Sequence, residues 1–158
     1  MHLPSTYLPV LDYLQRQIEG RLAADEATHM RYPTAISQML GFRIVAVGEA
    51  MAVVEFDADA QRHGNQQGTV HGGMLCELAD AAIGTAHSTL MEPGQSFTSI
   101  DLKAAFLRPV WRSRLCARAW ADESADVRDP AAGAGGAESA PVRRLASRRA
   151  KGKYDFQG

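Results

Sequence analysis

The sequence predicts an α+β fold in which a mostly antiparallel sheet packs against one long helix. Three observations predict it. A helical pattern of apolar residues runs from Gly72 to about Leu90, two apolar and β-branched runs precede it, and a period-two alternation follows it. The chain has 158 residues, which favours a single domain with a modest core.

The composition excludes several classes of protein. Hydrophobic residues make up 46% and charged residues 22%, as in ordinary globular proteins, and the formal net charge of -1 does not indicate a nucleic-acid partner. Cys76 and Cys116 are too few for a disulfide framework, so we expect a reduced, cytoplasmic setting. The sequence shows no secretory signal and no apolar run long enough to span a membrane, so we expect no membrane partner.

Two helices are expected near the N-terminus. Residues 7–24 carry apolar side chains at spacings of three and four, which predicts an amphipathic helix. A short helix is expected from Thr34 to Leu40, before Gly41. We assign residues 1–35 to a helical extension and 36–158 to the main domain.

The remaining elements alternate strands with the long helix. The runs 42–47 and 51–56, separated by Gly48-Glu49-Ala50, predict a hairpin, and 57–70 is expected to be a loop. The many alanines on the apolar stripe of 72–90 indicate a helix packed closely on a sheet. Strands are then expected at 98–106 and 115–120.

The stretch from 121 to 149 differs from the rest of the chain. It is rich in alanine, glycine, arginine and aspartate and has few large apolar groups, a composition typical of a flexible loop or disorder. Residues 150–156 again have the pattern of a strand.

His71-Gly72-Gly73 begins the long helix and is the first candidate for chemistry. The first N–H groups of a helix have no partner within it, and the helix dipole is positive there. Such a corner can stabilise the oxyanion that develops on a thioester carbonyl. Alternatively, the two glycines only permit a tight turn into the helix.

Asp80 is the second candidate, at the flank of the apolar stripe. A carboxylate there is either a solvated surface group or a base beside a pocket. Eight residues of helix rise about 12 Å, so Gly72 and Asp80 of one chain cannot both touch the same carbonyl carbon. If both act, one chain supplies Gly72 and a second chain supplies Asp80. The enzyme interpretation therefore requires a dimer.

Several segments together resemble the PaaI-type hotdog-fold acyl-CoA thioesterases, over roughly residues 36 to 120. They are Asn65, His71-Gly72-Gly73, Leu78-Ala79-Asp80-Ala81-Ala82, Ser99-Ile100-Asp101-Leu102 and Phe106-Leu107-Arg108-Pro109-Val110. The resemblance implies a hotdog fold, in which a curved antiparallel sheet wraps around one long helix. It also implies self-association as a dimer or tetramer and hydrolysis of a small aromatic or medium-chain acyl-CoA.

The resemblance implies roles for individual residues. Gly72 would supply the oxyanion N–H, and Asn65 would orient the thioester or the attacking water. Asp80 of a second chain would act as general base or as nucleophile, and Ser99 would help to place the water. His71 would orient the loop, and together with Gly73 we expect it to line the substrate site.

Other polar residues have plainer interpretations. Arg108 and Arg112 are either solvated or bind coenzyme A phosphates. The spacing of His63, His71 and His87 matches no standard zinc pattern, so we expect no metal and no cofactor besides the coenzyme A of the substrate. Cys76 has no evident histidine partner and is expected to be a small buried filler.

The chain departs from the family pattern after Ala121, where similar proteins continue with two long strands. Residues 121–149 are either a divergent insertion or a stretch translated in a shifted reading frame. Two other functions remain open: a hotdog hydratase or dehydratase, in which His71 would point into the pocket, and a hotdog protein that binds acyl-CoA without turnover.

Overall fold

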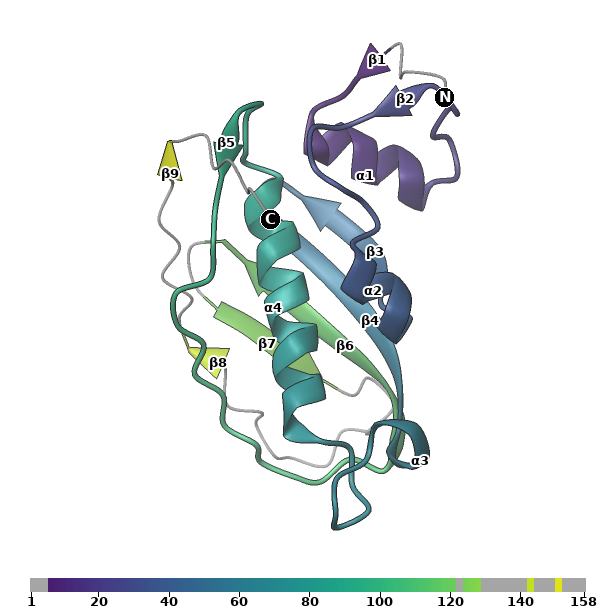
Figure 1. The fold of residues 1–158 in the computed structure, drawn as a ribbon, viewed down its shortest axis with the longest axis vertical. Coiled ribbons are helices and arrows are strands. Elements are labelled where there is room, and N and C mark those ends of the chain that lie inside the picture. Colours follow the sequence, from purple (N-terminus) through teal and green to yellow (C-terminus); the bar gives the residue numbers. More distant parts are fainter. Residues whose placement is uncertain (1–5, 122–123, 129–141, 144–149, 152–158) are drawn as a thin grey trace, which may run out of the picture.

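The structure is a computed structural model that describes residues 6–121, 124–128, 142–143 and 150–151 (Figure 1). Its helices are α1 (Val10–Ile18), α2 (Ala35–Leu40), α3 (Ala60–His63) and α4 (Gly72–Ser88). Its strands are β1 (Thr6–Tyr7), β2 (Glu26–Ala27), β3 (Arg43–Gly48), β4 (Met51–Asp59), β5 (Gln95–Ser96), β6 (Arg112–Trp120), β7 (Ser124–Arg128), β8 (Val142–Arg143) and β9 (Ala150–Lys151).

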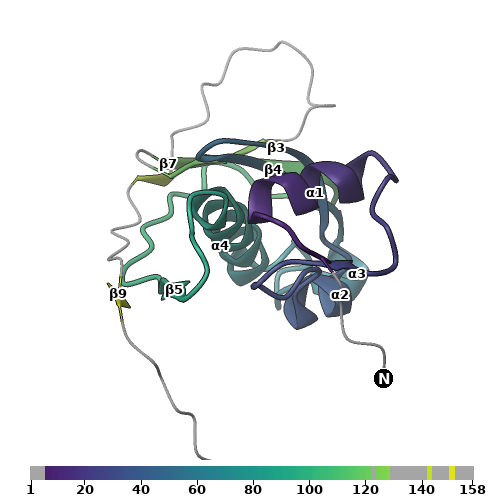
Figure 2. The same ribbon diagram turned by 90° about the horizontal axis from the view of Figure 1, so that it is seen from above.

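The main sheet has the strand order β3-β4-β6-β7-β8, and every neighbouring pair is antiparallel. Helix α4 packs against β4, β6 and β7, so the sheet forms a layer along one side of the helix (Figure 2). This confirms the predicted α+β architecture of an antiparallel sheet around one long central helix.

The core lies between α4 and the inner face of the sheet. Alternate residues of β4 are buried there, and their side chains meet the buried stripe of α4. Alanines dominate that stripe, and their small side chains let the helix approach the sheet closely. The residues that the two elements contribute to this core are Ala52, Val54, Phe56, Ala58, Leu78, Ala79, Ala82, Ile83 and Ala86.

The predicted hairpin is confirmed, but β4 is longer than expected. Gly48 pairs with Met51, so Glu49 and Ala50 form a two-residue loop, in which Ala50 has a φ of 56°. Strand β4 continues to Asp59, and the side chain of Asp59 then caps α3 by accepting from the Gln61 N–H at 2.8 Å. The expectation of a loop throughout 57–70 was therefore wrong for β4 and α3.

The two N-terminal helices form where they were predicted, with different precision. Helix α1 covers nine residues, about half of the predicted 7–24, and ends shortly before Gly20, whose φ is 68°. Helix α2 matches its prediction closely because both ends are capped. The Thr34 hydroxyl accepts from the Ser37 N–H, and Gly41 adopts the left-handed conformation.

The strand predicted at 98–106 was wrong. Within the described residues only Ser99 of that stretch takes part in a β-bridge, and the rest has no regular secondary structure. The segment runs beside α4, with Leu102 packed on the core. Alternation of apolar and polar residues indicates an extended backbone, whereas a strand also needs a neighbour to share its hydrogen bonds.

The C-terminal predictions are resolved only in part. Strand β6 confirms the strand at 115–120 and begins three residues earlier. Ser124–Arg128 pairs with β6, so the expectation of an unstructured stretch was wrong there, while 129–141 and 144–149 lie outside the described residues. Of the strand expected at 150–156, β9 is described and pairs with β5. The division into residues 1–35 and 36–158 stays a prediction.

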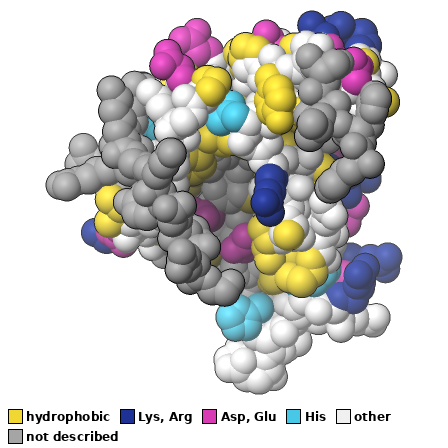
Figure 3. All heavy atoms as spheres, turned by 45° about the horizontal axis from the view of Figure 1, so that its top comes forward, with side chains coloured by type: hydrophobic (Ala, Val, Ile, Leu, Met, Phe, Trp, Pro, Cys, Tyr) yellow, Lys and Arg dark blue, Asp and Glu magenta, His cyan; other side chains and the backbone are white. Residues whose placement is uncertain are grey.

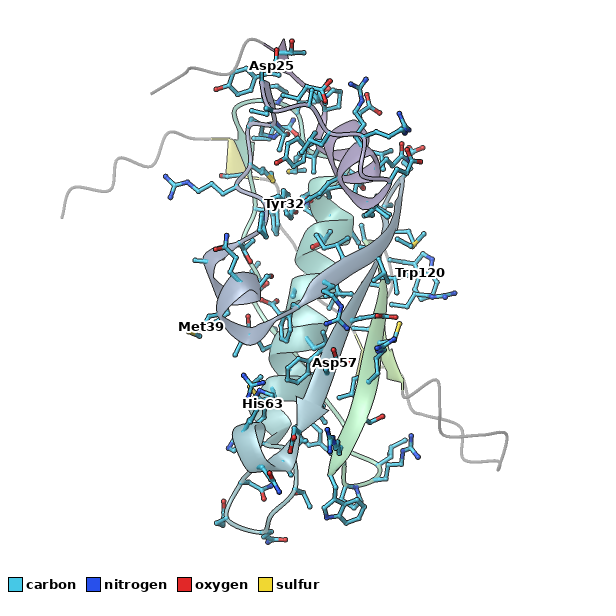
Figure 4. The ribbon with its side chains drawn as sticks, turned by 90° about the vertical axis from the view of Figure 1, so that its right-hand side faces the viewer. Asp25, Tyr32, Met39, Asp57, His63 and Trp120 are labelled. Carbon is cyan, nitrogen blue, oxygen red and sulfur yellow. The ribbon has the colours of Figure 1, made fainter. Side chains whose placement is uncertain are left out.

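A polar cluster joins the N-terminal segment to the C-terminal end of α4. The buried Ser88 hydroxyl donates to the Thr85 carbonyl at 2.7 Å, so Tyr32 is the donor in its 2.6 Å hydrogen bond with Ser88 Oγ. Figure 4 shows Tyr32 beside this part of α4. Burial raises the pKa of Tyr32, which keeps its hydroxyl protonated for that bond.

His29 is expected to make the protein less stable as the pH falls below about 6.5. Its Nε2 is buried without a hydrogen-bond partner among the described residues, and burial lowers the pKa of His29 below its ordinary 6.5. At a pH below the pKa of His29 in the unfolded chain, the unfolded chain binds more protons than the folded chain. The contribution of His29 to stability is complete above that pKa and is therefore lost as the pH falls.

Urea unfolding of the wild type and His29→Gln at about pH 7.5 and about pH 5.5 measures this contribution. The free energy of unfolding should fall less in the variant than in the wild type. Equal losses in both proteins would contradict the assignment to His29.

Candidate functional site

The first turn of α4 leaves one backbone donor unused. His71 caps the helix: its Nδ1 accepts from the Gly73 N–H at 2.9 Å, and its carbonyl accepts from the Met74 N–H at 2.9 Å. The Gly72 N–H makes no hydrogen bond to any described residue. The positive end of the helix dipole therefore presents this N–H to whatever binds beside it.

The ring of Phe106 packs on Gly72. A Cβ at this position would lie 2.9 Å from Cζ of Phe106, closer than real contacts allow. The aromatic ring lies against the glycine, and 57% of Phe106 is exposed. The contact is with the far end of an exposed ring that can move, so a Cβ at this position would displace Phe106 rather than be excluded.

Asn65 organises the loop before α4. Its side-chain oxygen accepts from the N–H groups of Gln67 and Thr69 at 2.9 and 3.2 Å, and its amide nitrogen donates to the Thr69 hydroxyl at 3.0 Å. The Val70 N–H then bonds to the Val110 carbonyl at 2.7 Å. In this chain the Asn65 side chain holds the loop together, with one amide hydrogen left for a substrate or water.

Asp80 lies in an open pocket of about 310 Å³. The Ser99 hydroxyl donates to Asp80 Oδ1 at 2.7 Å, which fixes one carboxylate oxygen. One wall is the face of α4 turned away from the sheet and the other is the segment 99–102. The lining residues are Gly73, Cys76, Glu77, Asp80, Ser99, Ile100, Asp101 and Leu102.

Burial raises the pKa of two titratable neighbours of Asp80. It raises the pKa of the Cys76 thiol, so the sulfur stays protonated and is a poor nucleophile. The expectation of a buried filler was wrong, because Cys76 is only half-buried and lines the open pocket. Burial, and secondarily the charge of Asp80, raise the pKa of Glu77. Two carboxylates one helical turn apart therefore interact in this pocket.

The structure brings together three of the predicted site residues: Gly73, Asp80 and Ser99 line the pocket. Gly72 and His71 do not line this pocket; they lie at the N-terminal end of α4, where His71 is exposed. Asn65 likewise does not line the pocket of its own chain.

Arg108 and Arg112 are exposed and also lie outside the pocket lining. They flank Val110, whose carbonyl accepts a hydrogen bond from the N–H of Val70, a residue of the loop before α4. Both arginines therefore belong to a segment that lies beside the loop at the start of α4.

Sequence reasoning missed Glu77 and Asp101, which line the same pocket. A signal for Glu77 was present, because positions 73, 76, 77 and 80 are spaced as one face of a helix. No local pattern could have found Asp101, since it depends on how the segment after α4 folds back.

The histidines are not gathered at one point. The His63 ring packs on Phe56 with centroids 4.8 Å apart, and the His87 ring packs on Phe97 at 5.0 Å. Within the described part of the chain no group of three or more His, Cys, Asp or Glu residues could hold a metal ion. Over the same residues, no helix has the length and apolar character needed to cross a bilayer.

Comparison with known proteins gives three kinds of match. The family model of the thioesterase superfamily matches residues 67–125, which include Gly72, Asp80 and Ser99. A candidate esterase of Haemophilus influenzae is 34% identical over 82 residues, which cover 51% of this chain and 57% of that protein. The matched part of the chain thus spans little more than half the length of this relative.

Solved structures share the fold. The PaaI protein of the E. coli phenylacetic acid degradation operon has a TM-score of 0.60 and 25% identity, covering 76% of this chain and 87% of that one. A Haemophilus influenzae thioesterase has a TM-score of 0.54 and 25% identity, covering 74% and 80% of the two chains. The chain is therefore similar to the thioesterase superfamily over residues 67–125 and has the hotdog fold of the PaaI protein.

Proposed function

We propose that this protein hydrolyses acyl-CoA thioesters, with Asp80 as the reacting carboxylate. The observation that carries the proposal is the Asp80 side chain, held at 2.7 Å by Ser99 in an open pocket of a thioesterase-superfamily fold. The unused Gly72 N–H supports it, because hydrolysis needs a donor for the oxyanion.

The reaction can follow two routes from this carboxylate. As general base, Asp80 takes a proton from water while the water oxygen attacks the thioester carbon. As nucleophile, it forms a mixed anhydride that water then hydrolyses. Both routes break the carbon–sulfur bond and release the acid and the coenzyme A thiol. Neither requires a metal ion or a further cofactor.

A complete site needs two chains. Gly72 and Asp80 are separated by eight residues of α4, about 12 Å along its axis, so one carbonyl cannot contact both. We propose a dimer or tetramer in which α4 of one chain presents Gly72 to Asp80 of another. Large apolar side chains exposed between 97 and 111 offer a surface for such contacts; they are Ile100, Phe106, Leu107 and Trp111.

The substrate is proposed to carry a small aromatic or medium-chain acyl group. The PaaI protein to which the chain is similar comes from a phenylacetic acid degradation operon. Arg108 and Arg112, on the segment beside the start of α4, are proposed to bind coenzyme A phosphates. A hydratase is less well supported, because His71 Nδ1 accepts from the Gly73 N–H and so caps α4.

Thiol release from a panel of aryl-acetyl, hydroxybenzoyl and fatty acyl-CoAs tests the proposed function. We expect turnover of at least one class, with loss of the thioester absorbance matching the thiol that appears. Hydration of an enoyl-CoA without thiol release would instead support the hydratase. Binding of acyl-CoA without either reaction would support a non-catalytic protein.

A further inference from the structure

Glu77 lies one helical turn before Asp80 and lines the same pocket. Residues three apart on a helix have Cβ atoms about 5–6 Å apart, so the two carboxylates are neighbours on one face of α4. The Glu77 side chain is half-buried. It therefore faces the contents of the pocket as well as solvent.

Negative charge in this pocket is only partly balanced. Among the residues that the structure describes, the lining contains three carboxylates, Glu77, Asp80 and Asp101, and no lysine or arginine. Asp101 is paired with Lys103 Nζ at 3.3 Å, and Asp80 accepts from Ser99. Glu77 makes no hydrogen bond or ion pair with any residue that the structure describes. Figure 3 shows acidic side chains inside a hollow of the face on which α4 lies.

The Glu77 carboxylate interacts electrostatically with Asp80 in the pocket. Its pKa is raised by burial and by the charge of Asp80, so the pocket is an unfavourable place for a further anion. A half-buried pair of like charges at about 5 Å interacts more strongly than the same pair in water.

We propose that Glu77 determines acyl specificity by rejecting acyl groups that end in a carboxylate and accepting neutral ones that can donate a hydrogen bond. The inference rests on the proposed thioesterase function of the same site. When the thioester carbon lies at Asp80, an acyl-chain group about 5–6 Å from that carbon reaches Glu77. In a six-carbon diacid, the second carboxylate lies at about this distance from the thioester carbon. A hydroxyl or amide there donates to the Glu77 carboxylate, whereas a carboxylate is repelled.

The test compares adipoyl-CoA with its neutral monoamide, which differ by one charge and have almost the same shape. Assays at about pH 8 keep carboxyl groups ionised. The wild type should hydrolyse the amide with the higher kcat/KM, and Glu77→Gln should reduce the amide-to-acid ratio by about tenfold. Glu49→Gln, in the exposed turn between β3 and β4, changes the net charge equally and should leave the ratio as in the wild type.

Binding of non-hydrolysable thioether analogues of both compounds separates this inference from the proposed function. If no thioester is hydrolysed but the analogues show the same ratio and the same change in Glu77→Gln, the thioesterase proposal fails and the specificity inference stands. If Glu77→Gln leaves the ratio unchanged, or shifts it no more than Glu49→Gln does, the inference is overturned. Failure to bind either analogue also overturns it.

Discussion

Asp80→Asn is expected to lower kcat for acyl-CoA hydrolysis by at least about 10²-fold, the lower end of what a general base contributes. Asparagine has the shape of aspartate and can still accept the Ser99 hydroxyl, so the pocket should keep its form. An amide oxygen cannot take a proton from water, nor form the anhydride. Thiol release with saturating substrate measures the loss, and Asp80→Ala should show a comparable one.

Glu49→Gln serves as the matched control, because it removes one carboxylate charge at an exposed turn. Its kcat should stay within about twofold of the wild type, since surface substitutions rarely disturb a distant site. A wild-type rate in Asp80→Asn would remove Asp80 from the mechanism. After multiple turnovers in ¹⁸O-water, label in the Asp80 carboxylate would identify the nucleophilic route, in which water attacks the Asp80 carbonyl of the anhydride.

Two defective variants are expected to restore activity when they are mixed. Gly72→Pro removes the proposed oxyanion N–H, which should lower kcat by about 10²–10³-fold, and Asp80→Asn removes the reacting carboxylate. In a mixed dimer, the intact Gly72 of one chain meets the intact Asp80 of the other. Random exchange then gives about a quarter of the wild-type activity, since half of the dimers are mixed and each has one complete site.

The backbone tolerates this proline. It occupies the first position of α4, where proline is well accommodated, and His71 before it has a φ of -61° and a ψ of 133°, an extended conformation suited to precede proline. Gly72→Ala is the matched control, because its Cβ meets the same Phe106 ring but it keeps the N–H. It should retain much more activity than Gly72→Pro. Mixtures of the two defective variants that stay inactive would show that the site does not combine Gly72 and Asp80 from different chains.

Elements with a strong local pattern could be predicted from the sequence. Helix α4 has a continuous apolar stripe, the hairpin has a short break between two apolar runs, and α2 has both of its caps in the sequence. Short-range periodicity and capping decide such elements almost by themselves. The same reasoning failed for 98–106, whose alternation predicts an extended chain without saying whether a partner strand lies beside it.

The candidate site divides in a similar way. The sequence alone determined the long helix, its glycine start and the eight-residue separation that requires two chains if Gly72 and Asp80 act together, because helix rise is fixed by backbone geometry. Only the tertiary structure decided that Ser99 holds Asp80, that Phe106 lies on Gly72, and that Glu77 and Asp101 share the pocket. These contacts arise where the chain after α4 folds back along the helix, and the packing that directs it there is distributed over residues distant in sequence.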